Sequence, residues 1–95
     1  MSQNLKNLDE LKISVIENID NQSTSAINIA KTILESPESG FREYKTSQIV
    51  QNEFEKIGLK YETDIALTGV KAKLSSGKPG PNIAVIGELD SLIVK

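Results

Sequence analysis

The chain has 95 residues, which is enough for one small domain with a single core. Its 11 basic and 13 acidic side chains give a formal charge of -2 and are scattered along the sequence, which argues against nucleic acid and anionic membranes as partners. Cysteine and histidine are both absent, so disulfides and thiolate-based metal sites are excluded within these residues.

The start of the chain shows no pattern of a secretion signal. It has no basic stretch followed by an apolar one, and no apolar run approaches the roughly 18 residues of a membrane span. Since the lack of cysteine is also compatible with a reducing compartment, we expect a cytoplasmic protein.

Apolar residues in the first third of the chain recur at helical spacing and stay in phase. They are Leu8, Leu11, Val15, Ile16, Ile19, Ala26, Ile27, Ala30, Ile33 and Leu34. This stripe predicts one long helix over about residues 5–35, with a weak point at the polar residues 21–25. Pro37 should end the helix, because the residue before a proline avoids helical dihedral angles.

A second helix is expected over about residues 43–57. Its inward face would carry Val50, Phe54 and Ile57, at spacings of four and three. Gly58 follows where a left-handed C-terminal cap is expected.

Three strands are predicted after the second helix, at about residues 60–64, 70–74 and 82–88. Residues 75–81 between the last two contain Pro79-Gly80, which suits the centre of a type II turn and predicts a hairpin. The same loop is not a phosphate-binding loop, because its prolines remove the amide donors that would hold the anion.

The order of these elements predicts an α/β fold. A long N-terminal helix and a second helix would pack on a mixed sheet. No repeat, low-complexity tract or linker divides the sequence, so no second domain is expected within residues 1–95.

Residues 36–43, the connecting loop, join the two predicted helices. Pro37 stops the first helix, Gly40 allows a bend, and Phe41 is expected to insert into the core. Glu43 would lie near the positive end of the second helix. The pattern favours a scaffold role over a chemical one.

Glu88 and Asp90 are the one pair of side chains whose spacing suggests a catalytic or metal-binding role. At the end of a strand the two carboxylates would point the same way, and Gly87 would allow close approach of a ligand. Such a pair can ligate a metal, share a proton or orient a histidine. The alternative interpretation is that the two carboxylates are solvated acids at a point where a strand reaches the surface. The sequence leaves both interpretations open.

Four pieces of the chain carry a family resemblance. They are Pro37 to Ser47, Phe54 to Gly58, Thr68 to Ala72, and Gly80-Pro81 leading into Ile83 to Leu92. In this order and at these distances they resemble the N-terminal segment of the zinc-peptidase-like amidohydrolases. This is the aminoacylase and carboxypeptidase family, with N-acyl-amino-acid and aminobenzoyl-glutamate hydrolases among its members.

The resemblance implies a catalytic domain with a divalent metal pair, zinc or manganese, that polarises an amide carbonyl and activates a water. Asp90 matches the family's strand-end aspartate and would be the catalytic-site residue, holding a metal-ligating imidazole in orientation. Glu88 stands where other branches have a metal-binding histidine. No metal ligand is assigned within this chain, and the substrate would be a small amide or peptide.

From this resemblance we expect an N-terminal portion of an amidohydrolase catalytic domain that is inactive by itself. A small non-catalytic α/β binding module and a structural remnant are the alternatives. An incomplete sheet would leave strand edges unpaired, so self-association or a molten state is expected for the isolated chain.

Overall fold

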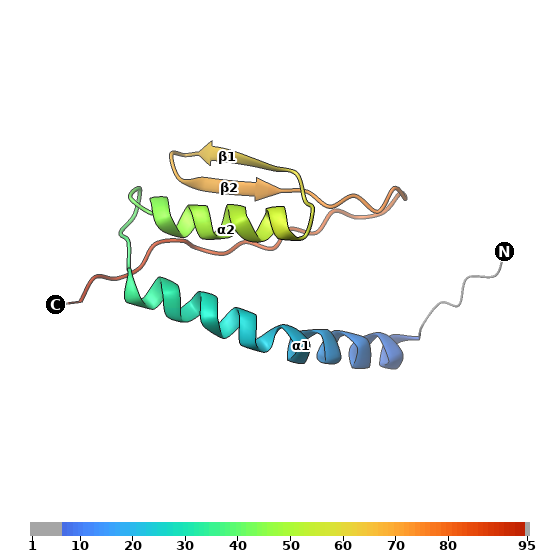
Figure 1. Ribbon diagram of the computed structural model, residues 1–95. Coiled ribbons are helices and arrows are strands. Elements are labelled where there is room, and N and C mark those ends of the chain that lie inside the picture. Colours follow the sequence, from blue (N-terminus) through green and yellow to red (C-terminus); the bar gives the residue numbers. More distant parts are fainter. Residues whose placement is uncertain (1–6, 95) are drawn as a thin grey trace. The chain divides into compact units, whose positions relative to one another are not determined.

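The computed structural model describes residues 7–94 and contains two helices and a small sheet (Figure 1). In chain order these are α1 (Leu8–Glu35), α2 (Tyr44–Lys56), β1 (Tyr61–Ile65) and β2 (Gly69–Ala72). The expected α/β composition and the long first helix are confirmed. The described part of the sheet is antiparallel and two-stranded, not mixed. The chain divides between Leu34 and Glu35 into two compact units.

Helix α1 is continuous, as the uninterrupted apolar stripe predicts. At its start, Asn7 Oδ1 accepts a hydrogen bond from the Glu10 backbone N–H at 2.9 Å, and Glu10 Oε2 accepts one from the Asn7 N–H at 3.2 Å. This reciprocal pair is a capping box, which satisfies amides that lack partners within the helix. The first positions of the expected helix, residues 5 and 6, lie outside the described residues.

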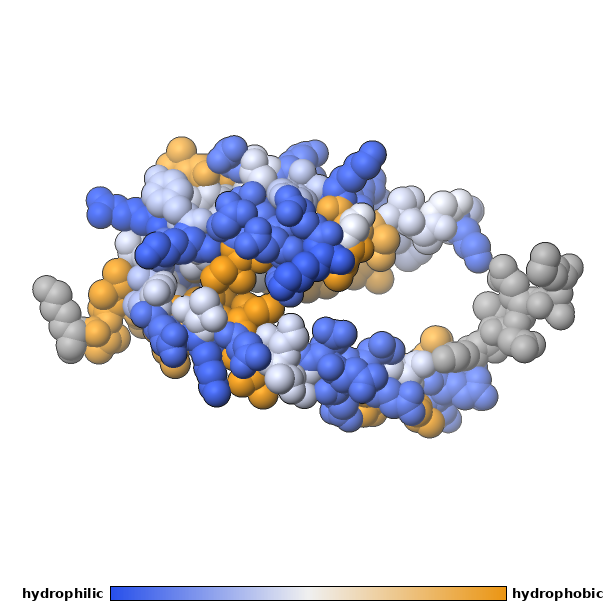
Figure 2. Space-filling model, viewed as in Figure 1, coloured by the Kyte–Doolittle hydropathy of each residue, from blue (hydrophilic) through white to orange (hydrophobic). Residues whose placement is uncertain are grey.

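The apolar stripe of α1 is exposed. None of the helix's residues is buried, and Leu8, Ile19 and Leu34 are 65%, 62% and 78% exposed. Apolar residues show at the surface of this helix, orange among blue, in Figure 2. An amphipathic helix gains most of its stability from packing its apolar face, and the described residues leave that face of α1 exposed. Within residues 7–94, no helix is long and apolar enough to cross a bilayer.

Helix α2 ends with a left-handed glycine, as predicted. Gly58 has φ of 75°, and the Leu59 N–H donates to the Phe54 carbonyl at 3.0 Å, closing the last turn. Phe54 is partly buried, with its ring 6.1 Å from that of Tyr61 on β1. Ile57 is 68% exposed, so its expected place on the inward face is wrong. It lies at the C-cap, where the helix no longer sets its direction.

Strands β1 and β2 form a tight antiparallel hairpin, with Tyr61 opposite Ala72 and Ile65 opposite Gly69. The register shifts within β1, next to Asp64, whose φ of 58° marks an irregularity in the strand. Gly69 is required by space, because a Cβ there would lie 2.5 Å from the Ile65 carbonyl oxygen. The Tyr61 hydroxyl donates to Glu55 on α2 at 2.5 Å, which raises the pKa of Tyr61 and ties the hairpin to the helix.

The predicted strand over residues 82–88 is not formed, and that prediction is wrong. In the described chain these residues belong to no ladder, and Ile83, Val85 and Ile86 are 87%, 96% and 88% exposed. A strand needs a neighbour for its backbone hydrogen bonds and a face for its side chains. Because residues 82–88 form no ladder with β2, the predicted hairpin across residues 75–81 is also absent. We call residues 82–88 the exposed segment.

Candidate functional site

The buried side chains of residues 7–94 are all polar. Glu43, Thr46, Ser47 and Thr68 are 8%, 3%, 5% and 5% exposed, while no apolar side chain in the same range is buried. They lie where the connecting loop meets the start of α2 and the turn of the hairpin. Buried polar groups are costly unless they are hydrogen-bonded, so their partners define how this region is held.

Glu38 in the connecting loop caps helix α2. Its Oε1 accepts hydrogen bonds from the Thr46 N–H at 2.6 Å and the Thr46 hydroxyl at 2.8 Å, and its Oε2 accepts one from the Lys45 N–H at 3.1 Å. Desolvation opposes ionisation of this carboxyl, but these hydrogen bonds outweigh it and lower the pKa of Glu38. The carboxylate therefore takes the place of a conventional N-cap side chain.

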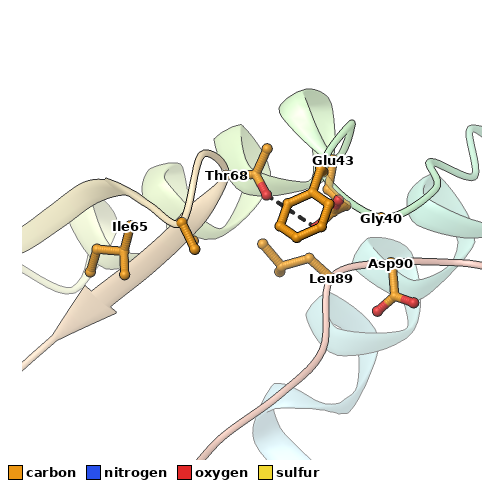
Figure 3. Close-up of a pocket in the computed structure, with 9 residues that line it drawn as sticks. Gly40, Glu43, Ile65, Thr68, Leu89 and Asp90 are labelled. Carbon is orange, nitrogen blue, oxygen red and sulfur yellow. Dashed lines mark hydrogen bonds between the residues drawn. The ribbon is translucent and has the colours of Figure 1, made fainter.

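Glu43 holds the hairpin turn to the connecting loop. It occupies the N-cap position of α2, and its side chain makes no capping bond there. Instead its carboxylate accepts hydrogen bonds from the Arg42 N–H at 2.9 Å and the Thr68 hydroxyl at 3.1 Å, the latter drawn in Figure 3. Glu43 thus lies at the positive end of α2, as predicted, while the capping hydrogen bonds come from Glu38.

An open hollow of about 310 Å³ lies beside the Glu43–Thr68 pair. It is lined by Gly40, Phe41, Glu43, Ile65, Ala66, Thr68, Gly69, Leu89 and Asp90. Phe41 is 65% exposed at the edge of this hollow, so its predicted insertion into a core is wrong. It lies in the turn closed by the bond from the Arg42 N–H to the Ser39 carbonyl, and a turn tip offers no apolar interior.

Asp90 is brought to the rim of this hollow, whereas Glu88 is not among its lining residues. Both are exposed. Figure 3 shows the side chain of Leu89 directed toward the Glu43–Thr68 pair and that of Asp90 directed away from it. Since no strand forms here, the strand alternation that would place the two carboxylates on one face does not apply.

The backbone next to Asp90 is fixed to the connecting loop. The Ser91 N–H donates to the Glu38 carbonyl oxygen at 2.7 Å. Residues far apart in the sequence are therefore adjacent at this point, and the same residue that caps α2 holds the chain beside Asp90.

The residues described here do not fit a metal pair. Within residues 7–94, no three side chains of the types that ligate metals, histidine, cysteine, aspartate or glutamate, are grouped as a site. The carboxylates of Glu38 and Glu43 already accept hydrogen bonds from the chain itself. We therefore derive no chemical step through a metal from these residues.

Sequence reasoning missed Glu38 and Thr68 as parts of this region. Glu38 lies in the connecting loop, ahead of the N-cap position Glu43 at which a capping side chain is sought, so its bonds to α2 had no standard sequence signal. The contact between Thr68 and Glu43 had no local signal, because it depends on the position of the hairpin against the loop.

Known proteins similar to this chain are hydrolases. IAA-amino acid hydrolase ILR1-like 6 of Arabidopsis thaliana is 37% identical over 67 residues, which is 70% of this chain and 14% of that protein. Thermostable carboxypeptidase 2 of Saccharolobus solfataricus is 36% identical over 70 residues, 73% of this chain and 18% of that protein. The putative amidohydrolase YhaA of Bacillus subtilis is 24% identical over 93% of this chain and 22% of its own length.

By name, these relatives belong to one class of protein, the hydrolases, as amino acid hydrolase, carboxypeptidase and amidohydrolase. More particularly, the chain is related to the amidohydrolases and carboxypeptidases over about 70% of its length, which confirms the family resemblance of its motifs. The chain spans only 14% to 22% of the length of these three relatives. No family model and no solved structure matches the chain.

Proposed function

We propose that a protein containing this segment hydrolyses the amide bond of N-acyl amino acids or small peptides. The observation that carries the proposal is the 36–37% identity to an IAA-amino acid hydrolase and a carboxypeptidase. Both names describe hydrolases of an amide bond next to an amino acid. Zinc or manganese and a cytoplasmic location belong to the same proposal, as does the absence of nucleic acid and membrane partners.

Within this proposal Asp90 is the catalytic-site residue. It would act by orienting a metal-bound imidazole supplied from elsewhere in the protein, since this chain contains no histidine. Its exposed carboxylate at the rim of the hollow is available for such a contact. Glu88, which does not line the hollow, is given no role.

The 95 residues alone are proposed to be inactive, because a catalytic metal site takes about three protein ligands and an open position. With zinc or manganese and an N-acyl amino acid, we expect no turnover above that of a Glu88→Ala, Asp90→Ala double variant. Metal-dependent turnover above this control would contradict the proposal.

A positive test exchanges the corresponding segment of thermostable carboxypeptidase 2 for this chain. We expect the chimera to retain hydrolysis and Asp90→Asn to lower it about 10- to 100-fold, the usual effect of losing a residue that orients a metal ligand. Exposed Asp64→Asn is the matched control and should leave the rate unchanged. Equal rates for the two variants would reject the role of Asp90.

The alternative is a non-catalytic α/β binding module. It predicts a monomer with a sharp two-state melt at micromolar concentration. The proposed hydrolase segment predicts self-association through the exposed apolar residues of positions 83–86, of which Val85 and Ile86 are the most exposed. Sedimentation of the purified chain separates the two.

A further inference from the structure

The hydrogen bond from the Ser91 N–H to the Glu38 carbonyl, 2.7 Å long, joins two distant parts of the sequence. Among the backbone hydrogen bonds of residues 7–94 outside the helices and the hairpin, it is the one that ties residues 82–94 to another part of the chain. Leu89 and Ser91, next to this bond, are half-buried, whereas the exposed segment that precedes them is open to solvent. The position of Asp90 therefore depends on this bond.

The acceptor of that bond belongs to a residue that is itself firmly held. Three hydrogen bonds, of 2.6, 2.8 and 3.1 Å, fix the Glu38 carboxylate to Thr46 and Lys45 at the start of α2. Bonds from backbone amides to a carboxylate are about twice as strong as those between neutral groups. Main chain and side chain of Glu38 thus connect α2 directly to the chain beside Asp90.

The loop around Glu38 holds an unfavourable backbone conformation. Phe41 has φ of 63°, a left-handed conformation that is unfavourable for a residue other than glycine. Such a conformation persists only where the surroundings determine it, and here a bond from the Arg42 N–H to Ser39 and two bonds to Glu43 surround it. The connecting loop is therefore a defined structure that can hold another segment in place.

We propose that Glu38 is a positioning residue for Asp90: its carboxylate anchors it to α2 while its carbonyl holds Ser91, and this fixes Asp90 at the rim of the hollow. The inference rests on the proposed function for the importance of Asp90. The placement itself does not depend on activity and can be measured without substrate.

The test is amide hydrogen exchange on the full 95-residue chain, read at Ser91, Lys45 and Thr46. Glu38→Ala removes the acceptors of three bonds, so we expect protection at Lys45 and Thr46 to fall. Because the loop then loses its anchor, protection at Ser91 should fall with it by at least about tenfold, which is one ordinary hydrogen bond of free energy. Glu62→Ala, an exposed glutamate of β1, is the matched control and should change none of the three.

Glu38→Gln is the conservative variant. Its amide oxygen can still accept from Thr46, while its NH2 group cannot accept from the Lys45 N–H. We expect protection at Ser91 to be intermediate between that of the unmutated chain and Glu38→Ala. Circular dichroism of each variant shows whether the helices persist, so a general loss of structure is recognised separately.

A purely capping role for Glu38 predicts a different result. In that case Lys45 and Thr46 lose protection in Glu38→Ala and Ser91 keeps it, which would overturn the proposal. Rapid exchange at Ser91 in the unmutated chain would overturn it as well. If Ser91 responds as expected but Asp90→Asn leaves the hydrolysis of the chimera unchanged, the proposed function fails and the positioning stands.

Discussion

The connecting loop 36–43 and the exposed segment 82–88 are held in opposite ways. The loop contains one of the four buried side chains of the described chain, that of Glu43, and makes bonds to α2, to the hairpin turn and to the chain beside Asp90. The exposed segment has apolar side chains up to 96% exposed and belongs to no ladder.

The difference teaches how order arises in a chain without a closed apolar core. The polar groups of the loop find partners nearby, at the start of α2, and also far along the chain, at Thr68 and Ser91. The exposed segment consists of strand-forming residues, which gain stability only when other strands supply hydrogen bonds and a packing face. The loop is therefore held by polar hydrogen bonds within the described chain, whereas the exposed segment belongs to no ladder in it.

The largest expected effect, and the one that best tests the difference between the connecting loop and the exposed segment, is on the self-association of the chain. Replacing Ile83, Val85 and Ile86 together by serine removes the apolar surface that we expect to pair between copies. Each such side chain contributes about 1.5–3 kcal/mol when buried, so association should weaken by at least a thousandfold. Sedimentation equilibrium measures this.

The control for this variant is Leu67→Ser with Leu74→Ser, two exposed apolar residues outside the segment. This pair should leave association nearly unchanged. A triple variant that associates as strongly as the unmutated chain would show that the exposed segment does not form the contact between copies. The conclusion that this segment needs a strand partner, in contrast to the connecting loop, would then have no support.

A smaller effect is expected in the loop. Glu43→Ala leaves the buried Thr68 hydroxyl without its acceptor, which should lower the free energy of unfolding by about 1–3 kcal/mol. The variant Glu62→Ala removes an exposed carboxylate and should change it by less than about 0.5 kcal/mol. Urea unfolding followed by circular dichroism compares them. Equal losses in the two variants would mean that the loop is not held by its polar contacts.

The smallest effect is the pH dependence caused by Glu38. The pKa of this carboxyl is lowered from its ordinary value of 4.5, so the folded state favours its ionised form. Its stabilising contribution is therefore complete above about pH 4.5 and is lost as the pH falls through the lower pKa of the folded state. Glu38→Gln should flatten the stability profile below pH 4.5, and an unchanged slope would contradict this assignment.

The helices could be predicted from the sequence because their signals are local. The apolar stripe predicted helix α1, Pro37 predicted where α1 ends, and Gly58 predicted where α2 ends. These features depend on spacings of a few residues and on dihedral preferences of single residue types. The capping box of Asn7 and Glu10 was equally local and was overlooked.

The sheet and the site were predicted less well because their contacts join distant residues. A run such as Ile83 to Ile86 has the composition of a buried strand wherever it occurs, and its partner cannot be read from it. The same holds for the pairing of Thr68 with Glu43 and of Ser91 with Glu38. Asp90 was identified through the family motif, and its place at the hollow came only from the structure.

The polar character of the buried side chains also bears on the response of the chain to heat. The heat-capacity change on unfolding grows with the apolar surface that becomes hydrated and shrinks with the polar surface. With Thr46, Ser47 and Thr68 among its few buried side chains, and with apolar side chains at most half-buried within residues 7–94, we expect a small heat-capacity change for a chain of this length. A shallow stability curve and a broad thermal transition would follow from it.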